Sequence, residues 1–257
     1  MKKLILFDMD GTLTPAREKM NWDMVSVLTK LQQQDWDVGV ISGSDLDYIE
    51  QQCDKLLDIS PFNARECHML PCNGTKYYKN LKKIWEYNIK DVIDQSQINK
   101  LIKCIFKQQL KIIKNYNIPL TGNFIEQRGS IINWCPIGRK ANHVERKIWC
   151  KLDEKNNIRI KSLEKLKKIT KEMNITVKLG GETSFDIYPV GWNKTFPLDK
   201  QPFSTYEQIY FIGDRCFKNG NDKEIYDYLN NKKNCKSFNT KNPLDTISIL
   251  KKHILKG

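Results

Sequence analysis

The sequence predicts an α/β protein, in which a doubly wound parallel-sheet core is interrupted by an inserted α+β domain with an antiparallel sheet. At both ends of the chain, short apolar runs alternate with amphipathic helical periodicity, as in a parallel sheet. In the middle, strand-like runs follow one another directly, as in an antiparallel sheet. The length of 257 residues allows one large domain or two smaller ones. We therefore expect a core over 1–86 and 190–257, and an insert over 87–189.

Strands and helices alternate in the first part of the core. Lys3–Phe7 is a short apolar run that ends in acidic residues, as expected of the first strand of a parallel sheet. Trp22–Leu31 places its apolar residues on one helical face. Val38–Ile41 predicts a second buried strand, which a Ser-Gly-Ser sequence ends. We expect the next helix to begin at Asp45, with Ser44 as its N-cap.

The same alternation returns near the C-terminus, whereas the insert has a different order. The second part of the core predicts strand, helix, strand and helix over Gln208–Ile212, Asp222–Leu229, Lys236–Phe238 and Leu244–Leu255. The insert begins with a long amphipathic helix, followed by two strands, two helices and two strands. These segments are Asn99–Ile113, Asn123–Gln127, Ser130–Cys135, Val144–Lys151, Ser162–Met173, Ile175–Leu179 and Ser184–Tyr188.

Composition and charge argue against several classes of protein. No apolar run approaches the roughly 20 residues that span a bilayer, and Asp8 and Asp10 interrupt the apolar start of the chain. We expect a cytoplasmic protein without a membrane partner, and eight cysteines without C-x-x-C spacing suit reduced thiols there. A net charge of +13 is compatible with nucleic-acid binding. Because no nucleic-acid motif accompanies it, we favour a lysine-rich surface that attracts anionic substrates and expect no nucleic-acid partner.

Two carboxylates follow the first predicted strand. Asp8 and Asp10 alternate along an extended chain and can point toward one site, and Gly11 permits a sharp turn. Ligands of open α/β sheets bind beyond the carboxyl ends of the strands. Two close carboxylates need a cation or a proton between them, and hard oxygen ligands suit Mg²⁺. A carboxylate can also attack phosphorus to give an aspartyl-phosphate. The alternative is a merely structural acidic turn, which the full D-x-D-G-T-L-T pattern disfavours.

Arginine usage points to phosphate binding in the insert. Lysine supplies nearly all the positive charge of the chain, so a retained arginine indicates planar, bidentate recognition. Arg128, Arg139 and Arg146 gather in one strand-strand-helix stretch, and we favour phosphate binding for these three. Surface ion pairing is the alternative, and it is equally supported for Arg17. The remaining arginines are interpreted as surface ion pairs: Arg65, Arg159 and Arg215.

The segment Asp8–Thr14 resembles the first motif of the haloacid dehalogenase superfamily. Further signals of that superfamily follow in order: a serine that ends the second strand, a lysine before the C-terminal strands, and an acidic motif after the strand that follows. These are Ser42 or Ser44, then Lys194, then Gly213-Asp214 with Asn221-Asp222. The resemblance implies a phosphate-binding serine hydroxyl, a charge-balancing Lys194, and an Mg²⁺ site. The implied metal ligands are Asp8, Asp10, Asp214, Asp222 and the Met9 carbonyl.

A more detailed resemblance is to the eukaryotic phosphomannomutases. The string D-M-D-G-T-L-T-P-A-R over Asp8–Arg17 is similar to their first motif, and other matches occur in family order along almost the whole chain. These are Phe124-Ile125-Glu126 with Arg128, Pro136-Ile137-Gly138-Arg139, Glu145-Arg146, Gly180-Gly181, Ser184-Phe185-Asp186 and Gly191-Trp192-Asn193-Lys194. Since the matches include the insert, the resemblance implies that the insert is a mobile cap domain.

This resemblance implies an activity and a set of roles. Asp8 would be the nucleophile and Asp10 the general acid and base in the interconversion of mannose 6-phosphate and mannose 1-phosphate, which supplies GDP-mannose synthesis. A hexose bisphosphate would be the activator, and the protein would form a homodimer through its caps. The implied substrate-binding residues are Arg17, Arg128, Arg139, Arg146, Ser184 and Asp186.

Two other functions remain open at this point. One is a sugar-phosphate phosphatase of the same superfamily, which would share the nucleophile and the metal site. The other, more distant, is a non-catalytic binding protein that uses the basic charge. Retention of Asp8, Asp10, Lys194 and Asp214 argues against the second, because a binding scaffold has no need of all four.

Overall fold

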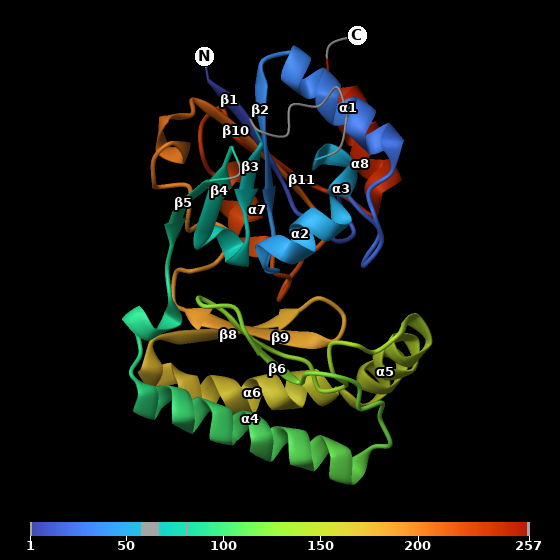
Figure 1. Cartoon of the computed structure of the whole chain (residues 1–257), viewed down its shortest axis with the longest axis vertical. Helices are drawn as coiled ribbons and strands as arrows, with labels where there is room; N and C mark the ends of the chain where they lie inside the picture. The colour runs from blue at the N-terminus through green and yellow to red at the C-terminus, as the bar shows by residue number, and fades with distance from the viewer. Residues whose placement is uncertain (1, 58–66, 81, 256–257) are drawn as a thin grey trace. The chain divides into compact units, whose positions relative to one another are not determined.

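The computed structural model describes residues 2–57, 67–80 and 82–255, and the chain forms two compact units (Figure 1). The core unit comprises Met1–Glu86 and Gly191–Gly257, and the cap unit comprises Tyr87–Val190. Each unit has its own sheet and its own hydrophobic core. Among the described residues, no helix combines the length and the hydropathy needed to cross a membrane.

The core unit contains a seven-stranded sheet with the order β11-β10-β1-β2-β3-β4-β5. β1 lies at its centre and pairs in parallel with β2 and β10, so that Phe7 lies opposite Val40 and Ile212. The carboxyl ends of these three strands therefore meet at one edge. The strands are β1 (Lys3–Phe7), β2 (Trp36–Ile41), β3 (His68–Leu70), β4 (Lys76–Lys79), β5 (Lys82–Glu86), β10 (Gln208–Gly213) and β11 (Lys236–Asn239).

The core sheet is parallel from β11 to β3, as predicted, and carries an antiparallel edge in addition. β4 pairs antiparallel with β3, and β5 pairs antiparallel with β4, so the two form an antiparallel edge on an otherwise parallel sheet. Neither strand was predicted from the sequence. β5 is largely exposed and rich in lysine, because an edge strand needs no apolar pattern and is protected from edge pairing by charge.

Helices cover both faces of the core sheet. Ile5 and Phe7 pack into a cluster that includes residues of α1 and α8, whereas the alternate residues Leu4 and Leu6 pack into a second cluster with residues of α7. This arrangement confirms the predicted doubly wound α/β class. The core helices are α1 (Trp22–Gln33), α2 (Leu46–Gln52), α3 (Asp54–Leu57), α7 (Lys223–Asn230) and α8 (Pro243–His253).

The N-cap of α2 differs from the predicted one. The Asp45 side chain accepts a hydrogen bond from the Leu46 amide, so Asp45 is the N-cap and the helix begins one residue later than expected. The predicted cap, Ser44, instead uses its backbone carbonyl to accept a hydrogen bond from the Cys72 amide, at 2.9 Å. Ser44 is therefore part of the loop that follows β2.

The cap unit is an antiparallel sheet covered by helices. Its four strands have the order β6-β7-β9-β8. One face is apolar, since Trp134 and Phe185 stack with ring centroids 4.5 Å apart in a core cluster that includes residues of α4 and α6. The elements are β6 (Ile125–Gln127), β7 (Ile132–Trp134), β8 (Ile175–Gly180), β9 (Ser184–Pro189), α4 (Gln95–Asn115), α5 (His143–Asn156) and α6 (Ile158–Thr170). The described residues also include short 3₁₀ turns at η2 (Cys72–Gly74), η3 (Ile89–Asp91), η4 (Lys171–Met173) and η5 (Phe203–Thr205).

A buried histidine makes the stability of the core unit depend on pH. His68 is fully buried, and its two ring nitrogens lie 2.9 Å from the hydroxyls of Tyr77 and Tyr206. Burial, aided by the charge of Lys79, lowers the pKa of His68 from 6.5 to about 4. The folded protein therefore binds fewer protons than the unfolded chain between these values. The contribution of His68 to the free energy of unfolding is fully present above pH 6.5. It is lost as the pH falls toward 4, and amounts to about 3 kcal/mol in total.

Urea unfolding at pH 7 and pH 4.5 measures this contribution. We expect His68→Gln, which keeps a hydrogen-bonding side chain but does not titrate, to lose less stability between the two pH values than the wild-type protein. Equal losses in both proteins would show that His68 is not the responsible group.

Candidate active site

Three carboxylates converge at the carboxyl edge of the core sheet. Asp8 directly follows β1, Asp214 follows β10, and Asp222 precedes α7. One oxygen of each lies within 4.8 Å of the others, and Asp8 and Asp222 are buried. Backbone hydrogen bonds fix this arrangement, since the Asp8 amide donates to the Ile212 carbonyl (2.9 Å) and the Arg215 amide donates to Asp222 Oδ2 (3.0 Å). The structure thus brings together three of the predicted metal ligands.

Lys194 supplies a buried positive charge to this cluster. Its side chain is 0% exposed, and its Nζ donates hydrogen bonds to Asp8 Oδ1 and to Asp222 Oδ1, the latter at 2.6 Å. Lys194 is 186 positions from Asp8 in the sequence, so only the fold brings the two together. The predicted pairing of the lysine with the first acid is therefore present in the geometry.

The cluster holds more negative charge than Lys194 balances. Burial raises the pKa of Asp8 well above its usual range. The positive charge of Lys194 lowers this pKa, whereas the negative charges of Asp222 and Asp214 raise it further. Burial and then the charge of Asp222 raise the pKa of Asp214 to about 6. Burial by itself lowers the pKa of Lys194. The negative charges of Asp222 and Asp8 outweigh this effect, so the pKa of Lys194 is raised. A site with these shifts favours an additional cation.

Unpartnered oxygens support the same conclusion. Asp214 Oδ1 and Asn221 Oδ1 are buried and have no hydrogen-bond partner among the described residues. Carboxylate and amide oxygens are hard donors of the kind that Mg²⁺ and Ca²⁺ prefer. The residues present therefore fit a divalent cation held by Asp8, Asp214 and Asp222, with Asn221 beside them.

Two further predicted metal ligands accept hydrogen bonds from the protein itself. The Met9 carbonyl accepts hydrogen bonds from the amides of Leu13 (2.9 Å) and Thr14 (3.1 Å), so it closes the turn that follows β1. The Asp10 side chain accepts hydrogen bonds from the Arg17 amide and the Tyr48 hydroxyl, both at 3.1 Å through Oδ1. Asp10 is therefore next to the cluster in sequence but is held by a different set of donors, and its side chain is not among the three grouped carboxylates.

The surroundings of Asp10 contain a residue that the sequence analysis missed. Tyr48 lies on α2, 38 positions from Asp10, and no motif marks it. Arg17 reaches Asp10 through its backbone amide, with a left-handed φ of 64°. Two donors on one oxygen fix the orientation of the Asp10 carboxyl group, which suits a group that must give and accept a proton at a defined place.

The predicted serines lie in a loop that is tied to the segment carrying Lys194. Ser42 is buried, and its Oγ accepts a hydrogen bond from the Ser44 amide at 3.1 Å. The Ser42 carbonyl accepts a hydrogen bond from the amide of Asn73 (2.8 Å), and Asn73 Nδ2 donates to the Trp192 carbonyl (3.2 Å). Asn73 thus connects the loops after β2 and β3 with the residues that precede Lys194.

A glycine is required where the loop after β1 passes the acidic cluster. Gly11 has a φ of +83°, and a Cβ atom there would lie 2.6 Å from Asp214 Oδ2. We expect Gly11→Ala to lower stability by about 1–2 kcal/mol through backbone strain and to displace the Asp214 carboxylate. Mg²⁺ affinity, measured by calorimetry, should fall by about 10-fold.

Gly191 provides a matched control for this substitution. Its φ is +85°, but no heavy atom lies within 4 Å of the position of a Cβ. Gly191→Ala should therefore show the backbone strain without the loss of Mg²⁺ affinity. The same loss of affinity in both variants would contradict the argument.

The second face of the cap sheet carries a row of polar residues. Glu126 lies opposite Asn133, Asn133 opposite Asp186, and Asp186 opposite Lys178. Asn133 Nδ2 donates to Asp186 Oδ1 at 2.7 Å, and a Cβ at Gly180 would lie 2.5 Å from Asp186 Oδ2. Because side chains alternate between the faces of a sheet, this row lies opposite the apolar face that packs on the helices.

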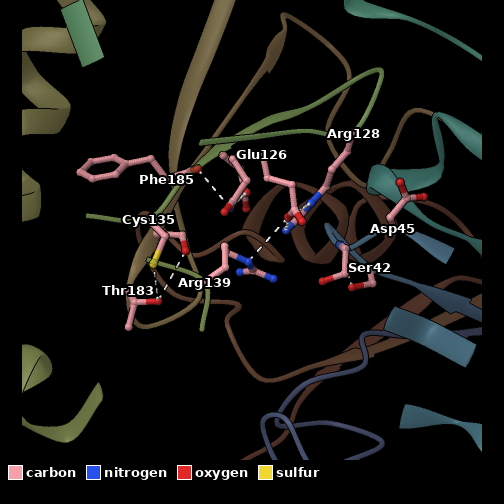
Figure 2. Close-up of polar contacts among 12 residues, drawn as sticks. Ser42, Asp45, Glu126, Arg128, Cys135, Arg139, Thr183 and Phe185 are labelled. Carbon is pink, nitrogen blue, oxygen red and sulfur yellow. Dashed lines mark hydrogen bonds and ion pairs between the residues drawn. The ribbon is translucent and has the colours of Figure 1, made fainter. Parts of the chain in front are cut away.

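Two of the predicted arginines contact Glu126, a residue of this row (Figure 2). Arg128 is buried and donates to Glu126 Oε2 through Nε (2.9 Å) and a terminal nitrogen (2.6 Å). Arg139 Nε lies 3.6 Å from the same oxygen. Two guanidinium groups thus share one carboxylate oxygen. This arrangement suits the binding of a further anion.

The other predicted cap residues form a second group. Arg146 donates to Thr183 Oγ1 at 3.2 Å, and that hydroxyl lies 3.4 Å from Ser184 Oγ. Cys135 Sγ lies 3.6 Å from the same Thr183 atom (Figure 2). Thr183 was missed by the sequence analysis, since a single threonine carries no motif. Arg159 pairs with Asp153 at 2.6 Å, but the side chains are only 12% and 10% exposed, so the ion pair is largely buried and not on the surface as predicted.

A doubly wound core with an aspartate after the first strand, a buried lysine and an acidic cluster defines a phosphoryl-transfer enzyme of the haloacid dehalogenase type. The model of the eukaryotic phosphomannomutase family matches residues 24–256. The chain belongs to the eukaryotic phosphomannomutase family. This membership confirms the predicted family, and the class of enzyme is that of its named relatives, an isomerase that transfers a phosphoryl group.

Named relatives match most of the chain. A phosphomannomutase of Dendrobium officinale is 36% identical over 225 residues, which is 87% of this chain and 84% of the relative. Phosphomannomutase 1 of Dictyostelium discoideum is 34% identical over 248 residues, 96% of this chain and 94% of the relative. The family and these relatives support phosphomannomutase function, as the sequence predicts.

Solved structures with lower identity share the fold. An IMP-bound IMP-nucleotidase of Plasmodium falciparum superposes with a TM-score of 0.65 at 16% identity, covering 97% of this chain and 67% of that one. The C-terminal domain of a C. albicans trehalose-6-phosphate phosphatase gives a TM-score of 0.60 at 19% identity, covering 89% and 73%. These likenesses confirm the α/β fold class of the chain.

Proposed function

We propose that this protein interconverts mannose 6-phosphate and mannose 1-phosphate through an aspartyl-phosphate on Asp8. The observation that carries the proposal is the buried cluster of Asp8, Lys194, Asp214 and Asp222 at the carboxyl edge of the sheet. A carboxylate nucleophile needs its own charge and that of the phosphoryl group to be offset, and Lys194 contributes to this directly.

The residues of the core unit have separate roles in the proposed reaction. Asp8 attacks phosphorus in line, and the bond between phosphorus and the sugar oxygen breaks. Asp10 protonates the departing hydroxyl and takes the proton back in the reverse step, while its Arg17 and Tyr48 contacts hold it in place. Lys194 and the Ser42 hydroxyl bind oxygens of the transferring group. Mg²⁺, held by Asp8, Asp214 and Asp222, would stabilise charge on those oxygens when bound.

The cap unit supplies recognition of the phosphate that is not reacting. A mutase must bind its substrate with a phosphate at either end of the hexose, and arginines recognise the phosphate without fixing the sugar orientation. In the structure, Arg128 and Arg139 both contact the Glu126 carboxylate. Arg146 contacts Thr183, which lies next to Ser184. Together with Arg17 of the core unit and Asp186, these residues are the proposed substrate contacts.

The sharing of Glu126 has a kinetic role in this proposal. A phosphate that binds Arg128 and Arg139 competes with a carboxylate already present, so its net affinity is lower than that of two unpaired arginines. A moderate affinity allows the sugar bisphosphate intermediate to leave the arginines, turn and bind again. We also propose that a hexose bisphosphate activates the enzyme by phosphorylating Asp8, and that the product supplies GDP-mannose synthesis in the cytoplasm.

Phosphorus NMR of the products tests the proposal. Enzyme, Mg²⁺, mannose 1-phosphate and a catalytic amount of hexose bisphosphate should give mannose 6-phosphate with little free phosphate. Free phosphate without mannose 6-phosphate would instead assign a phosphatase, the alternative that shares the same core residues. The Asp8→Asn variant is the control for both reactions.

We further propose that the protein forms a homodimer through its caps. An exposed apolar stripe runs along α4 at helical spacing: Phe106, Leu110 and Ile113 are 54%, 67% and 39% exposed. Leu110→Glu places a charge in this stripe and should shift the protein from dimer to monomer in light scattering. Leu244→Glu is a matched control on α8, because Leu244 is also 67% exposed. A monomeric wild-type protein, or an unchanged dimer in Leu110→Glu, would contradict the proposal.

A further inference from the structure

A cavity of about 420 Å³ lies between two helices of the cap unit, α4 and α6. Its α4 side includes Lys111 and Ile112, and its α6 side includes Lys161, Ser162 and Lys165. The lining residues recur at spacings of three and four along each helix, so each set lies on one helical face: Gln108, Lys111, Ile112 and Asn115 on α4, and Ile158, Lys161, Ser162 and Lys165 on α6. Because α4 and α6 pack on the apolar face of the cap sheet, the cavity is separated by that sheet from the polar row of Glu126 and Asp186.

The lysines of this cavity have no acidic partner among the residues that the structure describes. Lys111, Lys161 and Lys165 are all exposed, and no aspartate or glutamate lines the cavity. Lys111 and Lys165 also approach each other, and this contact together with the charge of Lys111 lowers the pKa of Lys165. Two ammonium groups that face each other are unfavourable unless an anion lies between them.

The rest of the lining offers hydrogen bonding and apolar surface. Ser162 is only 4% exposed and brings a hydroxyl group to the lining. Ile112 is buried and Tyr116 is half-buried, and both line the cavity. The volume is within the range of about 300–1,000 Å³ that is usual for small-molecule sites, and it exceeds what an inorganic ion needs.

We propose that the cavity between α4 and α6 binds a phosphorylated small molecule, whose phosphate contacts Lys111, Lys161 and Lys165 and whose uncharged part packs on Ile112 and Tyr116. Three lysines that line one cavity, two of them in contact, suit a phosphate dianion, for which lysine is a frequent ligand. The site is distinct from the proposed active site, because none of its residues belongs to the core unit or to the arginine groups of the cap.

Amide NMR of the full chain, titrated with glucose 6-phosphate and separately with inorganic phosphate, tests this site. The amides of Lys111, Ser162 and Lys165 should shift with saturation, at lower concentration for glucose 6-phosphate than for inorganic phosphate. Amides of Gly11 and Asp214 report binding in the core unit, so the two sites are observed separately. An absence of saturable shifts at the three cap amides would overturn the proposal.

Two lysine variants complete the test, one at a residue that lines the cavity and one at a residue outside it. Lys111→Gln should weaken binding at the cap amides by about 10-fold, the usual effect of losing a charge-assisted hydrogen bond. Lys167→Gln removes the same charge from α6 at an exposed residue that does not line the cavity, and it should change affinity by less than about twofold. Equal effects of the two substitutions would mean that phosphate binds through general attraction to a basic surface, and this would overturn the proposal.

Discussion

Asp8→Asn is expected to abolish phosphoryl transfer while leaving the fold intact. Turnover should fall by at least about 10⁴-fold, because an amide is not a nucleophile toward phosphorus and no other side chain can replace it. Stability should remain equal to that of the wild-type protein or rise. Burial and neighbouring acids raise the pKa of Asp8, so the ionised carboxylate is disfavoured in the fold, and Lys194 keeps its hydrogen bond to Asp222.

Two measurements separate these effects. Labelled hexose bisphosphate should transfer its phosphate to the wild-type protein but not to Asp8→Asn, and thermal unfolding should show no loss of stability. Labelling of the variant would place the nucleophile elsewhere. A large loss of stability would show that the carboxylate is needed for folding, and the loss of turnover would then have a structural explanation.

Lys194→Met is expected to have the largest effect on stability. The substitution leaves Asp8 and Asp222 buried without their ammonium partner, and removing one member of a buried ion pair costs about 3–5 kcal/mol. Lys223→Met is a matched control, because it removes the Lys223–Asp227 pair, whose side chains are 38% and 48% exposed. An exposed pair of this kind contributes about 0.5 kcal/mol.

Urea unfolding of both variants at neutral pH measures the difference. Lys194→Met should also lose turnover, since the nucleophile and the transferring phosphoryl group would lack a cation from the protein. Similar losses of stability in the two variants would mean that Lys194 does not balance the buried carboxylates. Normal turnover in Lys194→Met would remove it from the proposed mechanism.

Most of the fold could be predicted because buried strands and amphipathic helices carry strong patterns. The central strand β1 has the predicted bounds, Lys3–Phe7, and α1 and β10 begin where they were expected. The antiparallel edge formed by β4 and β5 was missed. An exposed edge strand can be polar on both sides, so its sequence lacks the period that reveals a half-buried strand.

The proposed site was predictable where a motif follows a strand, and not where tertiary contacts select a residue. Asp8 and Asp214 could be placed because each comes directly after a buried strand whose end lies at the same edge. Tyr48 and Thr183 could not be placed, because their contacts to Asp10 and Arg146 depend on how separate elements pack. That the Met9 carbonyl closes the local turn could not be predicted either, because the turn depends on the backbone path after β1.

Because the cap unit and the core unit have separate hydrophobic clusters, the chain can melt in more than one cooperative step. The cap unit, Tyr87–Val190, buries its own apolar cluster, and the core unit buries two others. When two units unfold independently, one can unfold while the other remains folded. A single midpoint temperature then describes the unfolding of neither unit. A substitution in either unit should be judged by a probe located in that unit, such as the tryptophans Trp36 and Trp134, which lie in different clusters.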